Sequence, residues 1–154
     1  MDDIKLTEEN YDFRYRSSGI IYNNDKTKIL LFKSENRNFY MLPGGKVNKL
    51  ESSEKTLKRE IKEETGLNIN ITCFKTFSES LVTENGKTHQ QVDAIYEAIY
   101  NEEIENDEFI SLEGKFISFK WFNIKDINKI NIEPSKIKFI IKGQTINHIE
   151  DGFK

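Results

Sequence analysis

The chain reads, from Gly45 to Leu67, GKVNKLESSEKTLKREIKEETGL. Its second half, Ser52 to Thr65, consists mainly of helix formers, opens on serines suited to an N-cap and is followed by Gly66 as a C-terminal stop. At about 100° per residue, Leu57 and Ile61 fall on one stripe of that helix. The stretch therefore predicts a loop followed by a helix that packs on the core through this stripe.

Three glutamates share one side of the predicted helix. Glu60 and Glu64 lie beside the apolar stripe, and Glu63 lies further round, towards solvent. Partial burial makes the repulsion between like charges costly, so a hard divalent cation is the natural compensation. Carboxylate oxygens without sulfur or imidazole favour Mg²⁺ or Mn²⁺, and the glycine turn at Gly44-Gly45 can add a backbone carbonyl. A solvated acidic face is the alternative, because glutamate is common on helix surfaces.

The spacing of seven residues in this stretch decides between these two interpretations. They are, in order, Gly45, Glu51, Arg59, Glu60, Glu63, Glu64 and Gly66. This order matches the Nudix box at every specified position, and seven fixed residues coincide by chance in on the order of 10⁻⁸ of sequence windows. The chain therefore resembles the Nudix (MutT-like) hydrolase family.

The resemblance implies a fold, a reaction and a metal site. The fold is of the α/β class, a Nudix-type α/β/α sandwich with a mixed β-sheet between helices. The reaction is Mg²⁺- or Mn²⁺-dependent hydrolysis of a nucleoside diphosphate linked to another moiety; a catalytically weak nucleotide-sensing module is the alternative. The implied metal ligands are Glu60, Glu63, Glu64 and the carbonyl oxygen of Gly45.

Two supporting residues and one departure belong to the same stretch. Glu51 and Arg59 are implied to form an ion pair that orients the metal-binding carboxylates, and a surface pair without consequence is the alternative. The family commonly has glycine just before the first glutamate of the box, where this chain has Leu50. We therefore expect the loop from Asn48 to Leu50 to differ in shape.

The general base and the substrate contacts are less closely defined. The base candidates are Glu60, Glu63 and a glutamate outside the box, for which Glu113 competes with Glu97, Glu102, Glu105 and Glu108. Phosphate contacts are expected from Lys33, Arg14 or Arg16, and from Gly44 and Lys46 beside the box. A base is expected to stack on Phe39, Tyr40 or Phe77. For each side chain, an ordinary core or surface role is the alternative.

Length and composition limit the number of domains, the kind of partner and the compartment that we expect. The 154 residues suit a single domain over 1–154, with its core at about 11–143. A net charge of -3 argues against a stable nucleic-acid complex, so the expected partner is a small nucleotide or nucleotide derivative; a homodimer is left open. One cysteine, Cys73, expected to be buried, and the absence of a signal or long apolar run predict a cytoplasmic protein that does not enter a membrane. His89 and His148 lie far apart in the sequence, which argues against zinc.

Hydrophobic periodicity predicts the other elements. Residues 1–10 are expected to be a polar lead-in, residues 43–45 a sharp loop, 101–108 a solvated loop, and the tail after Gly143 loosely held. Strands are expected at 13–22, 28–33, 39–42, 67–77, 90–100 and 116–122, and a last helix at 133–142.

Overall fold

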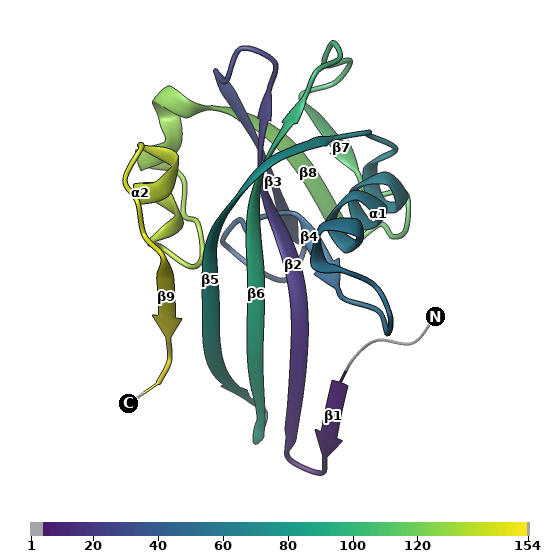
Figure 1. Ribbon diagram of the computed structural model, residues 1–154, viewed down its shortest axis with the longest axis vertical. Helices are drawn as coiled ribbons and strands as arrows, with labels where there is room; N and C mark the ends of the chain where they lie inside the picture. Colours follow the sequence, from purple (N-terminus) through teal and green to yellow (C-terminus); the bar gives the residue numbers. More distant parts are fainter. Residues whose placement is uncertain (1–4, 154) are drawn as a thin grey trace.

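A computed structural model describes residues 5–153 as a mixed sheet with helices on both faces (Figure 1). The strands are β1 (Lys5–Glu8), β2 (Tyr11–Asn23), β3 (Lys28–Ser34), β4 (Gly44–Lys46), β5 (Asn70–Glu84), β6 (Lys87–Tyr100), β7 (Glu108–Ile110), β8 (Ile117–Asn123) and β9 (His148–Asp151). The helices are α1 (Ser53–Thr65), the 3₁₀ helix η1 (Ile124–Lys129) and α2 (Ile137–Ile141).

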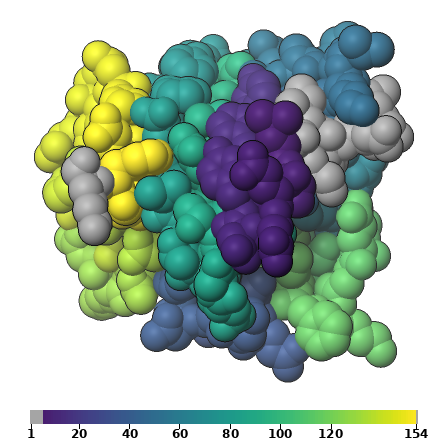
Figure 2. All heavy atoms as spheres, turned by 90° about the horizontal axis from the view of Figure 1, so that it is seen from below, coloured from purple at the N-terminus to yellow at the C-terminus, as the bar shows by residue number. Residues whose placement is uncertain are grey.

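The strand order in the sheet is β7-β8-β3-β2-β6-β5-β9, with β1 and β4 paired to β2. The long central pair is parallel, because β2 runs beside β6 from Tyr11↔Thr88 to Asn23↔Tyr100. β5 and β9 are also parallel, whereas the other pairs are antiparallel. Seen from below in Figure 2, the first strands lie against the β5–β6 segment, with the C-terminal segment beyond it. The sheet is therefore mixed, as expected.

Each face of the sheet has its own apolar core. On one face, Leu57 and Ile61 of α1 are completely buried and belong to a cluster with Ile21 of β2 and Trp121 of β8. On the other face, α2 and η1 pack on residues such as Ile20 and Leu31. The alternation along β2 sends neighbouring isoleucines to opposite cores, which is the period-2 geometry of a strand. These two cores confirm the expected α/β/α sandwich.

Residues 39–46 differ from the expected strand and loop. Only isolated bridges form at Tyr40 and Met41, so no strand covers 39–42. The pair Gly44-Gly45, expected in a sharp loop, instead begins β4 and pairs with Ser17 and Ser18 of β2. The expectation of a glycine turn was wrong because the sequence does not reveal that β2 offers a free edge here.

The two ends of the chain are more ordered than their composition suggested. The lead-in contains β1, although residues 1–4 lie outside the described residues, and the tail contains β9 with Ile149 buried in the core. The last helix, α2, begins only at Ile137, after a cis Glu133-Pro134 peptide bond. β5 starts at Asn70 and runs to Glu84, beyond the expected end.

Cys73 is exposed, contrary to the expectation that it is buried. It lies in β5 where the pairing with β6 shifts register between Ile71 and Cys73, so the simple alternation of inward and outward residues does not hold there. In the described part of the chain, no helix combines the length and apolar character needed to span a membrane.

Candidate active site

Helix α1 is fixed at both ends and along one side. The Ser52 side chain accepts a hydrogen bond from the Lys55 amide (3.3 Å), and Gly66 ends the helix in a left-handed conformation with φ of 78°. Burial of Leu57 and Ile61 sets the rotation of the helix about its axis. The face that carries the glutamates is therefore held in one orientation.

β4 brings its backbone directly against this helix. A Cβ atom added to Gly45 would overlap the carboxyl carbon of Glu60. Gly45 itself is held in place by its pairing with Ser17 of β2. The missing side chain lets the Glu60 carboxylate approach the β4 main chain closely, which is the arrangement that a shared cation would need.

Arg59 and Glu51 form a two-pronged ion pair beside these carboxylates. Arg59 donates from Nε to Glu51 Oε2 (2.8 Å) and from Nη2 to Glu51 Oε1 (2.9 Å). Glu51 Oε1 also accepts a hydrogen bond from the buried Thr56 hydroxyl (2.6 Å). The hydrogen bonds from Arg59, supported by Thr56, lower the pKa of Glu51 to about 2 although partial burial opposes them. Glu51 therefore stays ionised and anchors Arg59 over a wide pH range.

Arg59 also reaches the acidic face. Its Nη1 donates to Glu60 Oε1 (3.0 Å) and to Glu63 Oε2 (3.1 Å). Glu60 is largely covered, with a side chain 16% exposed, whereas Glu63 is 46% exposed. One guanidinium thus connects the loop before α1 to two of the three glutamates and limits their freedom of movement.

The buried carboxylates carry more negative charge than the protein neutralises. Burial raises the pKa of Glu64 to about 7, and repulsion from Glu60 and Glu113 adds to this shift, while Arg16 opposes it. Burial also raises the pKa of Glu60, against the effect of Arg59. A divalent cation would remove this repulsion, and a donor set made only of oxygen atoms fits Mg²⁺ or Mn²⁺. The donor types therefore fit the implied metal, while the oxygens of Glu60, Glu63 and Glu64 do not all lie within 4.8 Å of one another in the described part of the chain.

Glu113 is the glutamate outside the box that the structure brings to α1. The preceding residue, Leu112, donates its amide N–H to the Glu64 carbonyl (2.8 Å), which ties this loop to the end of the helix. Glu113 is exposed and adds to the repulsion felt by Glu60 and Glu64. The competing glutamates have other neighbours. Glu97 is paired with Lys26 and Lys75, and Glu108 faces Lys120 across β7 and β8. Glu102 accepts a hydrogen bond from Tyr100, whose pKa is raised by burial and by the charges of Glu102 and Glu105.

A cavity of about 530 Å³ opens on the sheet face opposite α1. Strands β2, β3, β5, β6 and β9 and two loops line it. The lining residues are Arg14, Arg16, Ser18, Phe32, Ser34, Arg37, Phe39, Met41, Leu42, Ser78, Ser80, Val82, Glu84, His89, Gln91, Asp93, Ile95, Glu133, Pro134 and Asp151. The wall therefore contains several cations and exposed aromatic surface, a combination suited to an anionic ligand with a planar group.

The structure separates the residues expected to contact substrate into three groups. Arg14, Arg16 and Phe39 line the cavity, and Arg16 acts electrostatically on Glu64 as well. Gly44 and Lys46 lie in β4 beside α1, and the Lys46 carbonyl accepts a hydrogen bond from Arg59 (3.3 Å). The remaining expected residues do not line the cavity: Lys33 lies over the Tyr40 ring, Tyr40 packs edge-on against Phe122, and Phe77 stacks on His148.

Leu50 adopts the conformation that glycine adopts most easily. Its φ is 66° and its side chain is fully exposed. The loop thus uses a left-handed residue at the position where the family commonly has glycine, and the leucine carries the steric cost of that conformation.

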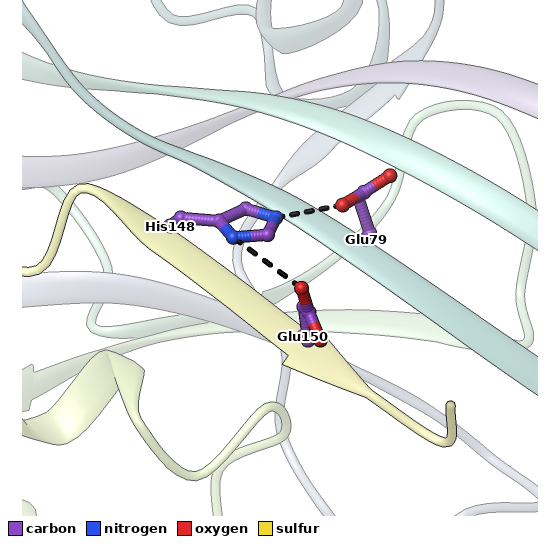
Figure 3. Close-up of side chains that lie close together, drawn as sticks. All are labelled: Glu79, His148 and Glu150. Carbon is purple, nitrogen blue, oxygen red and sulfur yellow. Dashed lines mark hydrogen bonds and ion pairs between the residues drawn. The ribbon is translucent and has the colours of Figure 1, made fainter. Parts of the chain in front are cut away.

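A second cluster of possible ligands lies away from α1. Glu79, His148 and Glu150 are the group of three acidic or histidine residues within 5–153 whose ligand atoms all lie within 4.8 Å of one another (Figure 3). His148 bonds Glu79 through Nε2 (2.7 Å) and faces Glu150 through Nδ1 (3.7 Å). Both ring nitrogens thus point to carboxylates, and the contact of His148 with Glu79 joins β9 to β5. The other histidine, His89, pairs with Asp12.

Asp93 is a feature of the cavity that sequence reasoning missed. It lies in β6 between Val92 and Ala94 and was counted only as part of a strand. Its Oδ2 accepts a hydrogen bond from the Ser18 hydroxyl (2.7 Å), whereas Oδ1 is buried without a partner among residues 5–153. Burial raises the pKa of Asp93, while Arg16 and Ser18 oppose the shift. The available signal was a charged residue within an otherwise apolar strand segment.

The chain is similar in sequence and in structure to known proteins. The sequence model described as NUDIX domain matches residues 13–142, whereas no curated protein sequence matches the chain. Similar solved structures include a MutT protein from Bacillus halodurans (19% identity, 89% of each chain, TM-score 0.63) and a NUDIX hydrolase from Nitrosomonas europaea (20% identity, 92% of this chain and 79% of that chain, TM-score 0.66). Another is the E. coli dihydroneopterin triphosphate pyrophosphohydrolase (14% identity, 85% of this chain and 94% of that chain, TM-score 0.64). Since the family model covers most of its length, this chain belongs to the NUDIX domain family.

Proposed function

We propose that this protein is a Mg²⁺-dependent pyrophosphohydrolase that cleaves the diphosphate linkage of a nucleoside diphosphate linked to another moiety. The observation that carries the proposal is the placement of two half-buried carboxylates, Glu60 and Glu64, on one face of α1. Burial raises the pKa of both, and repulsion from Glu60 and Glu113 adds to the shift of Glu64. Such a pair is costly to ionise on an ordinary helix face, and a bound cation would compensate that cost. One of the structural neighbours is itself named a pyrophosphohydrolase, which supports the class of reaction.

The proposed cation ligands are Glu60, Glu63, Glu64 and the Gly45 carbonyl oxygen. When bound, Mg²⁺ or Mn²⁺ would supply the positive charge that stabilises the diphosphate oxygens and activates water. The role of Glu51 is to hold Arg59, and Arg59 in turn orients Glu60 and Glu63 through its Nη1 atom. We assign these two residues a positioning role.

Proton removal from the attacking water is proposed for a carboxylate at the same face. The candidates are Glu60, Glu63 and Glu113, of which Glu63 and Glu113 are exposed enough to exchange protons with solvent. Arg14 and Arg16, which line the cavity, are proposed to hold phosphate oxygens, and Phe39 is proposed to stack on the base. Arg16 is well suited to this role because its charge lowers the pKa of Glu64, on the metal-binding face, and that of Asp93, in the cavity wall.

The test is a substrate panel. Nucleoside triphosphates, nucleotide sugars and dinucleoside polyphosphates are incubated with Mg²⁺ or with EDTA, and the products are separated by ion-exchange chromatography. The proposal predicts cleavage of a diphosphate bond in at least one compound, with Mg²⁺ only. Measurable binding without cleavage of any compound would instead indicate a nucleotide-sensing module.

A further inference from the structure

Asp12 is a buried carboxylate that holds two side chains of the cavity wall. Its Oδ2 accepts a hydrogen bond from Arg14 Nε (2.8 Å), and its Oδ1 is bonded to His89 Nδ1. Asp12 is only 7% exposed and does not line the cavity, whereas Arg14 and His89 do. The carboxylate therefore lies behind the wall and fixes a guanidinium and an imidazole in it, here called the Arg14–His89 pair.

Both members of the pair keep nitrogen atoms for a ligand. Although burial alone would raise it, hydrogen bonds from His89 and Arg14 hold the pKa of Asp12 below its ordinary value, so this group is ionised and can only accept. His89 Nδ1 therefore carries a proton. The other ring nitrogen, Nε2, has no hydrogen-bond partner among residues 5–153 and is not one of the buried unpartnered atoms there, so it has accessible surface. Within the same residues the Nη atoms of Arg14 also lack a partner, and its side chain is 34% exposed.

These nitrogen atoms suit a phosphomonoester. The guanidinium fork can donate to two phosphate oxygens. His89 Nε2 accepts in the neutral imidazole and donates in the imidazolium, so a bond to an oxygen needs one proton between the two atoms. A phosphomonoester loses its second proton near pH 6, about where an imidazole titrates, so at neutral pH either partner can supply that proton. A carboxylate, which ionises near pH 4, has no such proton to share.

The pair lies at a distance from the metal-binding face. β4 joins β2 at residues 16–18, beside that face, and Arg16 lowers the pKa of Glu64. Arg14 is two residues further along β2 and Asp12 four, which is about 7 Å and about 13 Å in a strand. Arg14 and Arg16 both line the cavity. A diphosphate cleaved at the metal-binding face would reach Arg16 first, and a phosphate at Arg14 would be a separate group, joined to it by a spacer such as a ribose ring.

Other acidic side chains of the cavity wall lie away from the pair or are already neutralised. Glu84 forms an ion pair with Arg37 (3.2 Å). Asp151 lies on β9, three strands from Arg14, which corresponds to roughly 14 Å across the sheet. Glu133 belongs to the segment before α2, not to the strands that carry the pair. An anion can therefore approach the pair on the β2–β6 side of the cavity.

We propose that Arg14 and His89, positioned by Asp12, form a subsite for a second phosphate of the substrate, a phosphomonoester separate from the cleaved diphosphate. The proposal rests on the proposed hydrolysis and narrows its substrate class to nucleotide derivatives that carry an additional phosphate, such as one on a ribose hydroxyl. Arg14 and His89 are then specificity-determining residues, and Asp12 is a positioning residue.

Binding of nucleoside bisphosphates tests this inference. Dissociation constants of adenosine 2′,5′-bisphosphate, adenosine 3′,5′-bisphosphate and AMP are measured by calorimetry with Mg²⁺. The three compounds share the base and the 5′-phosphate and differ only in the second phosphate and its position. We expect at least one bisphosphate to bind tenfold or more tightly than AMP, since the guanidinium and the imidazole form charge-assisted hydrogen bonds to the additional group. Equal affinity for all three compounds would overturn the inference.

Variants locate the effect. Arg14→Gln and His89→Leu should each bring the ratio of the two dissociation constants to within about threefold of unity. Asp12→Asn should lower the same ratio, which a loss of general stability would not do, because both ligands would be affected alike. The matched control is Arg37→Gln, the same change at another cation of the cavity wall, and it should keep the wild-type ratio. An unchanged ratio in Arg14→Gln, or an equal loss in Arg37→Gln, would overturn the inference even if Asp12→Asn does not fold.

The bisphosphates also separate this inference from the proposed hydrolysis, because they contain no diphosphate bond and their binding does not depend on turnover. If no compound of the substrate panel is cleaved, but a bisphosphate binds tenfold more tightly than AMP and Arg14→Gln removes the difference, the inference stands and the hydrolysis fails. If a compound of the panel is cleaved while neither bisphosphate gains affinity over AMP, the hydrolysis stands and the inference fails.

Discussion

Arg59 contacts both carboxylate oxygens of Glu51, at 2.8 and 2.9 Å, and with its remaining nitrogen atom contacts Glu60 at 3.0 Å. The two hydrogen bonds to Glu51 fix the guanidinium plane, because two parallel hydrogen bonds define both position and orientation. The hydrogen bond to Glu60 then orients a proposed metal ligand relative to this plane. The ion pair therefore connects the loop before α1 to the metal-binding face, and its geometry depends on a fork that only arginine provides.

Arg59→Lys should lower kcat/KM by about 10- to 100-fold, because lysine keeps the charge but cannot bind Glu51 and Glu60 together. Steady-state kinetics at saturating Mg²⁺ measures the loss. Lys58→Arg, an exposed change on the same helix, should leave kcat/KM unchanged. Equal activity of Arg59→Lys and the wild type would show that the fork has no positioning role.

Without metal, the stability of the protein should fall as the pH rises from about 4.5 to about 7. The Glu64 pKa is about 7 in the folded protein, against 4.5 for the free side chain, so the folded state binds this proton more tightly. The resulting stabilisation is complete below pH 4.5 and is lost as the pH rises through 7, a change of up to about 3 kcal/mol.

Urea unfolding in EDTA at several pH values measures this dependence. Glu64→Gln should flatten it, since glutamine does not titrate, and Mg²⁺ should restore stability above pH 7 in the wild type only. A wild-type curve that matches that of Glu64→Gln across this pH range would contradict the proposed burial of the charge.

Gly45→Ala should lower activity by at least about 100-fold, because the new methyl group overlaps the Glu60 carboxyl group and must displace it. Denaturant unfolding should show a smaller effect, since Glu60 can turn towards solvent. Gly114→Ala is the matched control, because a Cβ atom there meets nothing within 4 Å. Full activity in Gly45→Ala would rule out a close approach of Glu60 to β4.

Leu50→Gly should stabilise the protein by about 0.5–1 kcal/mol. Relief of the left-handed strain at φ 66° outweighs the greater freedom that glycine gives the unfolded chain. The control is Leu112→Gly, at another exposed leucine that lacks a positive φ, where the same substitution should destabilise. A loss of stability in both variants would indicate that Leu50 is not strained.

Local patterns were sufficient to predict the helix that carries the proposed metal ligands. The helix, its caps and the placement of Glu60, Glu63 and Glu64 follow from spacing within one turn or two, and the structure places α1 as expected. The strand at Gly44 was missed because its formation depends on partners in β2, more than twenty residues away. β9 was missed for the same reason, because pairing with the distant strand β5 overrode its polar composition. β1 was missed because its polar composition gave no sign of the hairpin that it forms with β2.

The surroundings of the site depend on contacts distant in sequence. Glu113 was one of several candidate glutamates, and only the bond from the Leu112 amide to the Glu64 carbonyl distinguishes it from the others. Asp93 was not noticed, because an unpartnered carboxylate is a property of the packed structure. Leu50 was noticed as a departure from the family pattern, whereas its positive φ became visible only in the structure.

A comparison of Glu63→Gln with Glu54→Gln shows whether the α1 carboxylates form the centre of a Mg²⁺-dependent pyrophosphohydrolase. Both glutamates are exposed on α1, and only Glu63 lies on the proposed metal-binding face. The measurement is the rate of diphosphate cleavage with Mg²⁺, at equal folded fraction, on the best compound of the substrate panel. We predict a loss of about 100-fold or more in Glu63→Gln and a wild-type rate in Glu54→Gln. Near-wild-type rates in both variants would contradict it.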